Sequence, residues 1–574
     1  MKAIDTDFLK FIGQEAQYFI PIYQRKYSWG IHECRRLYED VIKVARDEQR
    51  PCHFIGAVIY LSKKNGTQHS SATKEYLVID GQQRLTSLAL LLLALGEYYQ
   101  TITAAPHQDK DPLLRKSLSE RYIVNRFEDG DLYYKIRLNE EDFNSYKKIV
   151  RGDFSSDAQD SPHIFENYNY FLHMMKAGGD NPQEIFNGIT KLKLIDTALD
   201  PEDNPQLVFE TVNSTGLALS TPDKIRNYLL MTVPPDEQTY LYKEYWHPME
   251  HDLGLDTGAD WRFNAFFKYY MTVVTERQTP NDYYSIFKDY HSAVKCDGTE
   301  SILKHIRRYS KHFIRWENAS KDSAGIDYRL YRIRSLGQYN ITPAVLRVLD
   351  DVAYGAVSES DAGRVLSVIE SYWARRSLCD LPTNTAGSVC ISILKSLGSK
   401  ENYVDSVINT FIFGLTDAQR MPNDEEMLTR MRTRKLYGDK FWERKLLDLL
   451  EQHESREYIH NDAFSIEHIM PQTIHETDDK DKDWISDLGD DWERIHNTYL
   501  NTLGNLTLTG FNTEYSNRRF IVKRDMNDGY AHTPIRISAM LAHLDKWGEK
   551  EIVERCDKLT KIILDIWKYP SLQG

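Results

Sequence analysis

A glutamate and a histidine stand side by side near the carboxyl end of the sequence, in the stretch FSIEHIMPQT. Glu467 and His468 close a strand-like run that Pro471 ends, and TLGNLTLTGFN then supplies Asn505, a second short strand and Asn512. Histidine accepts a proton near neutral pH, and carboxylate and amide oxygens suit a hard cation such as Mg²⁺ or Mn²⁺. In the order strand, strand, helix, these residues can form a single-metal site for phosphodiester hydrolysis, with His468 as general base.

The residues alone leave the roles of the two asparagines open. Either amide can bind the metal while the other orients the imidazole. A lone histidine beside a glutamate is more often structural or merely exposed, so the prediction depends on the whole set and its order.

A second group of polar residues, Asp80-Gly81-Gln82-Gln83-Arg84, separates an apolar strand from a long apolar helix. Backbone N–H groups and the dipole at a helix start favour an anion, and Gly81 allows a ligand to approach the backbone. Arg84 can pair bidentately with phosphate oxygens. The alternative is that Asp80 caps the helix and Arg84 makes a surface ion pair.

Two further segments favour the phosphate site. Arg25 follows Tyr23-Gln24 in the otherwise apolar FIPIYQRKYSWG, and the helix-like LVFETVN carries Glu210 and Asn213 before a break at residues 214–216. A second helix is predicted from the Ser220/Thr221 cap, with Pro222 at its first position. Polar residues around such a break, Asp223 and Asn227 included, are well placed to face a pocket.

Residues 5–235 thus resemble the DUF262 family, on P-x-Y-Q-R-x-Y-S-W, D-G-Q-Q-R and F-E-x-x-N-x-x-G. The resemblance implies a fold similar to the ParB/sulfiredoxin type and binding of an NTP (GTP, ATP or UTP), with hydrolysis. The residues implied in nucleotide binding are Arg25, Asp80, Gly81, Gln82, Gln83, Arg84, Glu210 and Asn213. No P-loop sequence G-x-x-x-x-G-K-[ST] is present, so an NTPase must use this other cradle.

Residues 440–570 resemble the HNH (ββα-metal) nuclease domain of the DUF1524 family, on IEHIMPQ, TLGNLTLTGFN and a lysine downstream. The resemblance implies that His468 is the general base, that Glu467 and Asn512 hold the metal, that Asn505 supports the histidine and that Lys523 touches phosphate. The two resemblances in one chain match the GmrSD type of modification-dependent, type IV restriction enzyme. Their implied partners are double-stranded, modified phage DNA and a nucleotide, and the related proteins suggest a homodimer.

The elements that must position these groups give an α+β protein in three parts. We predict a nucleotide-binding domain over 1–235, a helical connector over 236–440 and the nuclease domain over 441–574. Within 304–334 nine Lys/Arg accompany three acids, and within 429–445 seven accompany two, each interleaved with aromatic residues. Such runs suit phosphate contact and base stacking, with Arg307 and Arg308 as DNA-binding candidates, although they are also common on solvated helix faces.

Composition limits the remaining choices. The 574 residues carry a net charge of −13, so DNA binding requires local basic patches. The six cysteines are scattered without C-x-x-C pairs, which argues against a disulfide framework or a cysteine zinc site. The uncharged apolar run of residues 85–96 is shorter than the roughly 20 residues that span a bilayer, and no signal peptide is evident. We expect a cytoplasmic endonuclease without membrane partners.

Two alternatives remain from the sequence. One is an NTP-dependent DNA sensor or regulator whose HNH unit binds DNA without cutting it. The other is an HNH nuclease without nucleotide control.

Overall fold

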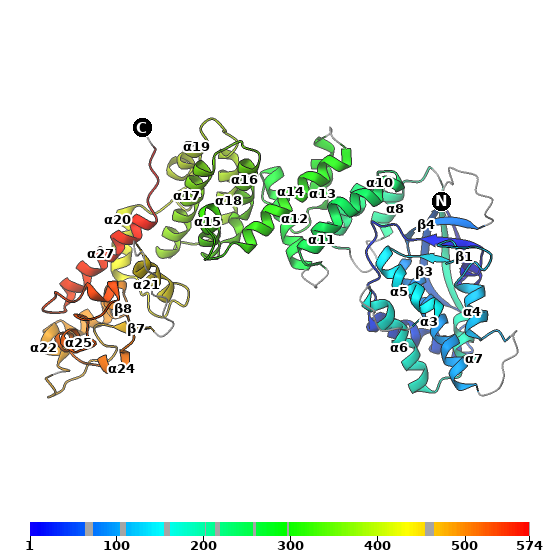
Figure 1. The fold of residues 1–574 in the computed structure, drawn as a ribbon, viewed down its shortest axis with the longest axis horizontal. Coiled ribbons are helices and arrows are strands. Elements are labelled where there is room, and N and C mark those ends of the chain that lie inside the picture. Colours follow the sequence, from blue (N-terminus) through cyan, green and yellow to red (C-terminus); the bar gives the residue numbers. More distant parts are fainter. Residues whose placement is uncertain are drawn as a thin grey trace. The chain divides into compact units, whose positions relative to one another are not determined.

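The structure is a computed structural model (Figure 1). It describes residues 1–62, 73–103, 111–153, 161–200, 202–212, 219–255, 260–294, 298–453, 464–480 and 482–572. By their contacts these residues form two compact units. The first contains residues 1–264 and 282–307, and the second contains residues 265–281 and 308–574. The predicted three-part division at 235 and 440 stays a prediction.

The first unit is built on one mixed β-sheet of six strands. Its strands are β1 (Lys2–Asp7), β2 (Ala16–Phe19), β3 (His53–Ser62), β4 (Lys74–Asp80), β5 (Ile136–Arg137) and β6 (Leu192–Leu199). They lie in the order β1-β6-β3-β4-β2-β5. The β1–β6 and β3–β4 pairs are antiparallel, and the other neighbours are parallel. A mixed sheet with helical connections confirms the predicted α+β class.

Helices cover both faces of this sheet. One face meets α1 (Phe8–Ile12), α2 (Ile31–Arg46), α3 (Gln82–Ile102), α4 (Arg115–Tyr122), α5 (Glu140–Arg151), α6 (Pro162–Gly178) and α7 (Pro182–Thr190). The other face meets α8 (Pro205–Val212) and α9 (Thr221–Met231). Because side chains alternate along a strand, Val58 and Val78 enter the first core while Ile59 and Ile79 pack beneath α8.

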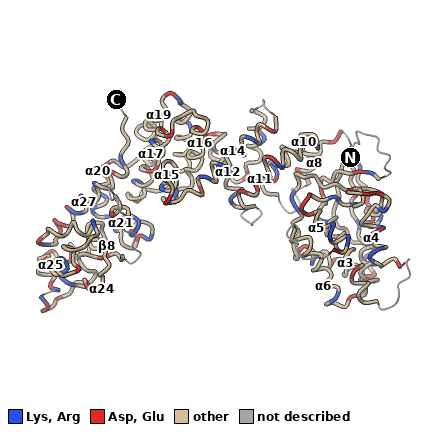
Figure 2. Tube along the Cα trace, viewed as in Figure 1, with Lys and Arg blue, Asp and Glu red and all other residues tan. Residues whose placement is uncertain are grey.

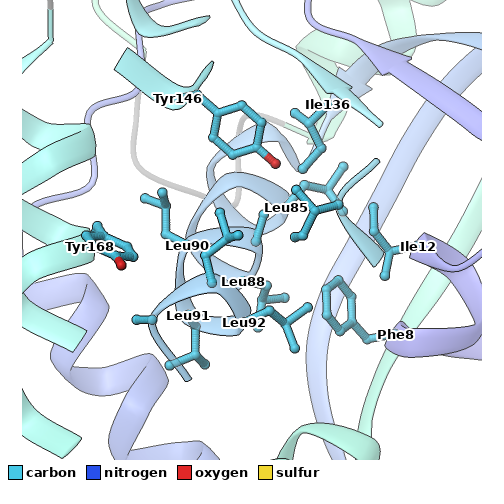
Figure 3. Close-up of a cluster of buried hydrophobic side chains, with 14 of the residues drawn as sticks. Phe8, Ile12, Leu85, Leu88, Leu90, Leu91, Leu92, Ile136, Tyr146 and Tyr168 are labelled. Carbon is cyan, nitrogen blue, oxygen red and sulfur yellow. The ribbon is translucent and has the colours of Figure 1, made fainter. Parts of the chain in front are cut away.

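The helix α3 is the centre of the larger core. Its leucines are buried on all sides, and Figure 3 shows several of them among Phe8, Ile12, Ile136 and Tyr146. A helix that is apolar all round is a core helix or a membrane span. By length and composition α3 alone among the described helices could cross a membrane, but 72% of its apolar window is buried inside the protein. It therefore acts as the core helix of the sheet.

The region between residues 236 and 440 is mostly helical in its described residues, which contain no named strand. In order, its elements are α10 (Pro235–Leu241), the π-helix η1 (Tyr242–Trp246), α11 (His247–Asp252), α12 (Asp260–Thr275), α13 (Tyr284–Ala293), α14 (Gly298–Asn318), α15 (Gly325–Arg334), the 3₁₀ turn η3 (Tyr339–Ile341), α16 (Thr342–Ala353), α17 (Glu359–Leu378), α18 (Ala386–Ser396), α19 (Tyr403–Asn409), the π-helix η4 (Thr410–Gly414) and α20 (Asp424–Thr433).

The carboxyl-terminal part of the second unit combines a two-stranded sheet with helices. Its elements are α21 (Glu443–Gln452), β7 (Ser465–His468), α22 (Trp484–Leu488), α23 (Trp492–Tyr499), the 3₁₀ turn η5 (Leu503–Asn505), β8 (Leu506–Thr509), α24 (Asn512–Tyr515), α25 (Phe520–Asp525), α26 (Arg536–Ala539) and α27 (Glu549–Ile566). The strands pair antiparallel, with Glu467 opposite Thr507 and His468 opposite Leu506. The expected order of strand, strand and helix is thus present.

Basic and acidic residues are interspersed along the described trace (Figure 2). Five cysteines among the described residues are free thiols: Cys34, Cys52, Cys379, Cys390 and Cys556. This agrees with the expectation that no disulfide framework is present at those positions.

Candidate functional site

The imidazole of His468 lies at the end of β7, and polar groups contact both of its nitrogens. Nε2 is 3.1 Å from Oδ1 of Asn501, and the amide nitrogen of Gln472 is 3.3 Å from Nδ1. An acceptor at Nε2 and a donor at Nδ1 fit the neutral imidazole with its proton on Nε2. The residue is 6% exposed, whereas Gln472 is exposed. Nδ1 is therefore the nitrogen that can accept a proton, and the exposed residue Gln472 covers it.

The electrostatics of His468 favour the neutral form. Burial lowers the pKa of the imidazole, and the charges of Lys523 and His496 lower it further, while the bond to Asn501 raises it. The net shift is downward from the ordinary value near 6.5. At neutral pH the ring is thus unprotonated and ready to accept a proton.

The backbone around Asn501 also fixes an aromatic wall beside the imidazole. The Asn501 carbonyl accepts hydrogen bonds from the backbone N–H groups of Leu436 (2.7 Å) and Tyr437 (3.2 Å). The Tyr437 ring consequently lies 4.4 Å from the His468 ring, at 70°. Neither Asn501, Gln472 nor Tyr437 was identified from sequence. The sequence offered only a general indication of them, namely that each nitrogen of a buried imidazole needs a hydrogen-bond partner.

Glu467 points to the opposite face of the strand from His468, because neighbouring residues on a strand alternate. Its Oε1 lies 2.6 Å from Nζ of Lys523, which also donates to the carbonyls of His468 and Ile469 at 3.0 Å each. Burial raises the pKa of Glu467 and lowers that of Lys523, and each shift is opposed by the charge of the other residue.

These contacts differ from those predicted for Lys523 and Glu467, whose roles stay predictions. Lys523 is 0% exposed and three oxygens accept its hydrogen bonds, so it cannot touch a DNA phosphate in this structure. Glu467 is 3% exposed and already neutralises an ammonium group, so its carboxylate does not fit a metal site in this arrangement. Among the described residues no group of three or more His, Cys, Asp or Glu side chains is placed to hold a metal ion.

The two predicted asparagines both hold backbone. Asn505 is fully buried, and its amide bonds both the N–H (2.8 Å) and the carbonyl (2.9 Å) of Met470, two residues after the histidine. It therefore fixes the turn that follows β7 and supports His468 only through the chain. Asn512 begins α24 and donates to the hydroxyl of Ser465 (3.1 Å) and the carbonyl of Ile466 (3.0 Å). Its Oδ1 receives no donor from the described residues and is the oxygen that remains free for a ligand.

The D-G-Q-Q-R sequence joins β4 to α3 through Gly81. This residue has φ +102°, and a Cβ there would lie 3.0–3.1 Å from Val58 and from the carbonyl of Ala57. Only glycine adopts this conformation without strain, and it brings the helix start against β3. The helix begins at Gln82, with Gly81 rather than Asp80 in the N-cap position.

The two glutamines tie this helix start to the segment that follows Arg25. Gln82 donates to the Arg25 carbonyl at 3.0 Å. Oε1 of Gln83 accepts from the N–H groups of Ser28 (2.9 Å) and Trp29 (3.1 Å). Both side-chain amides therefore hydrogen-bond to backbone groups. To contact a nucleotide as predicted, each amide would have to bind it in addition to these backbone groups.

The cations beside the glutamines are less fully engaged. Arg84 donates to the Ala57 carbonyl at 2.8 Å and lies 3.7 Å from Asp80, which is the ion pair weighed as the alternative. Burial lowers the pKa of Arg25, although the carboxylates of Asp223 and Asp80 raise it. The structure thus brings Arg25 together with Asp80, Gly81 and Arg84 from two segments of the chain.

Glu210 lies on α8, where three neighbours hold its carboxylate. Tyr284 (2.5 Å) and Gln206 (3.0 Å) donate to Oε1, and Lys288 (3.1 Å) donates to Oε2. Burial raises its pKa, but these hydrogen bonds outweigh burial and the net pKa is lowered. Asn213 lies outside the described residues.

The arginines predicted to bind DNA are paired with protein carboxylates. Arg307 contacts Asp252 at 2.7 Å, and Arg308 contacts Asp350 at 2.6 Å and lies over the ring of Tyr354. Binding of either to DNA would have to replace these pairs.

The two basic runs meet in a cavity of about 1050 Å³ within the second unit, and the lining of this cavity also includes Asp322, Glu370 and Asp448. Tyr328, Tyr331 and Arg332 line it from the first run, and Lys440 and Phe441 line it from the second.

Comparison with known families gives two matches. The model of the GmrSD restriction endonuclease N-terminal domain matches residues 7–230, and the model of the GmrSD restriction endonuclease C-terminal domain matches residues 421–562. Together they cover more than half of the chain. No curated protein matches it.

Proposed function

The chain belongs to the GmrSD restriction endonucleases, and from that premise we propose that it is a nucleotide-regulated, metal-dependent DNA endonuclease of phage defence. Its substrate is double-stranded DNA. As for other type IV restriction enzymes, we propose that this DNA is modified phage DNA. The observation that carries the proposal is the neutral, doubly oriented imidazole of His468 at the end of β7.

His468 acts as the general base. Its Nε2–H is held by Asn501, so Nδ1 is directed to accept the proton of an attacking water. The water oxygen then bonds to phosphorus as the leaving oxygen of the DNA backbone departs. Gln472 covers Nδ1 from an exposed position, so the attacking water must take the place of its amide or bridge to it.

Dependence on Mg²⁺ or Mn²⁺ is part of the proposal through the family resemblance. It is not carried by Glu467, whose carboxylate is bonded to Lys523. Cleavage assays with EDTA and with each ion added back measure this dependence directly.

The N-terminal domain binds the NTP, with Arg25, Asp80 and Arg84 around the phosphates. Support comes from the half-buried Arg25, and from Gly81, which brings the start of α3 close against β3 and so places Arg84 beside Asp80. Hydrolysis of the NTP and its coupling to DNA cleavage belong to the same proposal.

A second candidate function is an NTP-dependent DNA sensor that binds DNA without cutting it. The Glu467–Lys523 pair favours this candidate, because the carboxylate expected to hold a metal is already neutralised.

One experiment separates the two candidates. Purified full-length protein is mixed with modified and unmodified phage DNA, with Mg²⁺ or Mn²⁺ and with each of the four NTPs. We expect strand cleavage by the wild type and its loss in His468→Ala, with NTP binding retained. His543→Ala changes an exposed histidine of the same unit and serves as the control. Cleavage by His468→Ala at the wild-type rate would remove the proposed base, and DNA binding without cleavage by the wild type would favour the sensor.

A further inference from the structure

A small cavity of about 200 Å³ lies between α8, α9 and α13 in the first unit. The rings of Phe209, Tyr228 and Tyr284 form much of its wall. Whole drug-sized ligands occupy pockets of roughly 300–1,000 Å³, so this volume suits a single ring system of a larger ligand. Because α13 lies beyond the residues 7–230 matched by the N-terminal family model, part of this wall comes from the segment that follows that domain.

The unusual feature of the cavity is Asn227 on α9. Its side chain is 1% exposed, and within the part of the chain that the structure describes neither its amide nitrogen nor its amide oxygen has a hydrogen-bond partner. A buried amide without partners is costly, and nearly all buried polar groups in proteins are paired. A group that lines a cavity and has both a donor and an acceptor unused is arranged to bind something that enters the cavity.

The two tyrosines of the wall are already held in place. The Tyr284 hydroxyl bonds Glu210, the Tyr228 hydroxyl lies 3.2 Å from Nδ1 of His291, and the two tyrosine rings meet edge to face at 6.3 Å. A ligand therefore meets a preformed aromatic site and loses little free energy in ordering it. Among the described lining residues, Asn227 has both a donor and an acceptor unused, and the ammonium group of Lys224 also lines the cavity.

The chemistry of the wall points to a heteroaromatic base. Aromatic rings bind the faces or edges of a planar ring, and an asparagine amide pairs through two hydrogen bonds with an edge that has a donor beside an acceptor. Adenine has such an edge, with its N6 amino group beside N7, and asparagine is its usual bidentate partner.

The helix α9 connects this cavity with the proposed phosphate cradle. Asp223 acts on the charge of Arg25, and Asn227 lies one turn further along the same helix. One turn of α-helix rises only about 5–6 Å, so one short element serves both groups.

We propose that this cavity binds the base of an adenine nucleotide, with Asn227 reading the base edge between the tyrosine and phenylalanine rings. The proposal rests on the nucleotide binding proposed above, and it adds that the protein selects adenine as the base of this nucleotide. It makes the cavity a specificity site for the nucleotide that regulates the enzyme.

The test is calorimetric titration of the full-length protein with ATP, GTP, UTP and CTP. Asn227→Leu replaces the amide by an apolar side chain of similar size, and Asn187→Leu makes the same change at an exposed position on α7. We expect ATP to bind most tightly to the wild type. The affinity for ATP should fall about 10- to 100-fold in Asn227→Leu, as for the loss of a bidentate base contact, and stay unchanged in Asn187→Leu.

The melting temperature of the nucleotide-free protein gives a second readout. Because the amide is unpaired in the empty cavity, Asn227→Leu should melt at or above the wild-type temperature. A lower melting temperature, or failure of the variant to fold, would show that the amide has a structural partner and would overturn the inference.

The failures can be told apart. Wild-type ATP affinity in Asn227→Leu, or tighter binding of another NTP than of ATP, overturns the base pocket and leaves nucleotide regulation standing. Absence of binding for all four NTPs overturns the proposed nucleotide regulation together with the pocket.

Discussion

Asn501 is the residue that sets both the direction and the basicity of His468. Its Oδ1 accepts the Nε2–H and raises the pKa of an imidazole that burial lowers. A base works only while neutral, so cleavage should rise with pH through the pKa of His468 and level off above it. Since the net shift is downward, we expect the midpoint of this rise below the ordinary value of about 6.5. A pH–rate profile of kcat/KM measures it.

Two substitutions of Asn501 should move this profile in opposite directions. Asn501→Ala removes the acceptor, so the pKa falls further and the rise moves to lower pH, while misorientation lowers kcat by about 10- to 100-fold. Asn501→Asp keeps an acceptor and adds a negative charge, so the pKa increases and the rise moves to higher pH. A lost fold would lower the rate without these opposite shifts. If both variants keep the wild-type profile, Asn501 is not the partner of the catalytic base.

At the scale of elements, β7 and α25 are joined by the buried pair of Glu467 and Lys523. Removing one member of such a pair leaves a buried charge without compensation and costs about 3–5 kcal/mol, whereas replacing both by apolar groups can be nearly neutral. We therefore expect Lys523→Met alone to destabilise the second unit by about 3–5 kcal/mol, and Glu467→Met with Lys523→Met to cost clearly less. Urea unfolding measures both.

Lys546→Met is the matched control for this pair, because Lys546 lies in the same unit with its side chain 77% exposed. It should change stability by less than about 0.5 kcal/mol. If the double variant is as unstable as the sum of its single changes, the two residues do not act as a pair.

The contrast between α3 and this pair shows what the sequence could predict. The apolar run from Leu85 predicted a long apolar helix, and α9 begins at its predicted Ser220 cap, because apolar composition and capping are local properties. The orientation of Glu467 depends on Lys523, 56 positions away, and on strand alternation that places it opposite to His468. No local pattern records such a contact, so the sequence did not indicate the pairing of Glu467 with Lys523, whereas His468 keeps its predicted place at the strand end.

Asn501 was missed for a related reason. It lies between α23 and η5, in a stretch where no periodic pattern indicates which side chains point inward. Asn505, four residues later, drew attention as part of the family pattern, although its amide holds Met470 rather than the imidazole. Identifying the partner of the base required the antiparallel contact of residues 435–437 with Asn501 and Thr502.

At the scale of the whole molecule, the proposed nucleotide site and the proposed cutting site lie in different compact units. Control of DNA cleavage by the nucleotide must then depend on a coupling free energy between the two sites. Variants of either site alone can therefore test this coupling. Arg84 donates to a backbone carbonyl and lies only loosely beside Asp80, so its guanidinium can turn to a phosphate at small cost.

Arg84→Ala should therefore weaken NTP binding while the cutting site stays intact. Loss of charge-assisted hydrogen bonds to phosphate is expected to lower NTP affinity about 10- to 100-fold, and cleavage measured at subsaturating NTP should lose its response to nucleotide. His468→Ala should show the reverse, with normal NTP affinity and no cleavage. Arg36→Ala, which removes an exposed arginine on α2, is the control and should match the wild type in both assays. Cleavage by Arg84→Ala that still follows NTP concentration as in the wild type would mean that the D-G-Q-Q-R turn does not carry the nucleotide signal, and that its polar residues serve only to hold β4, α3 and the segment after Arg25 together.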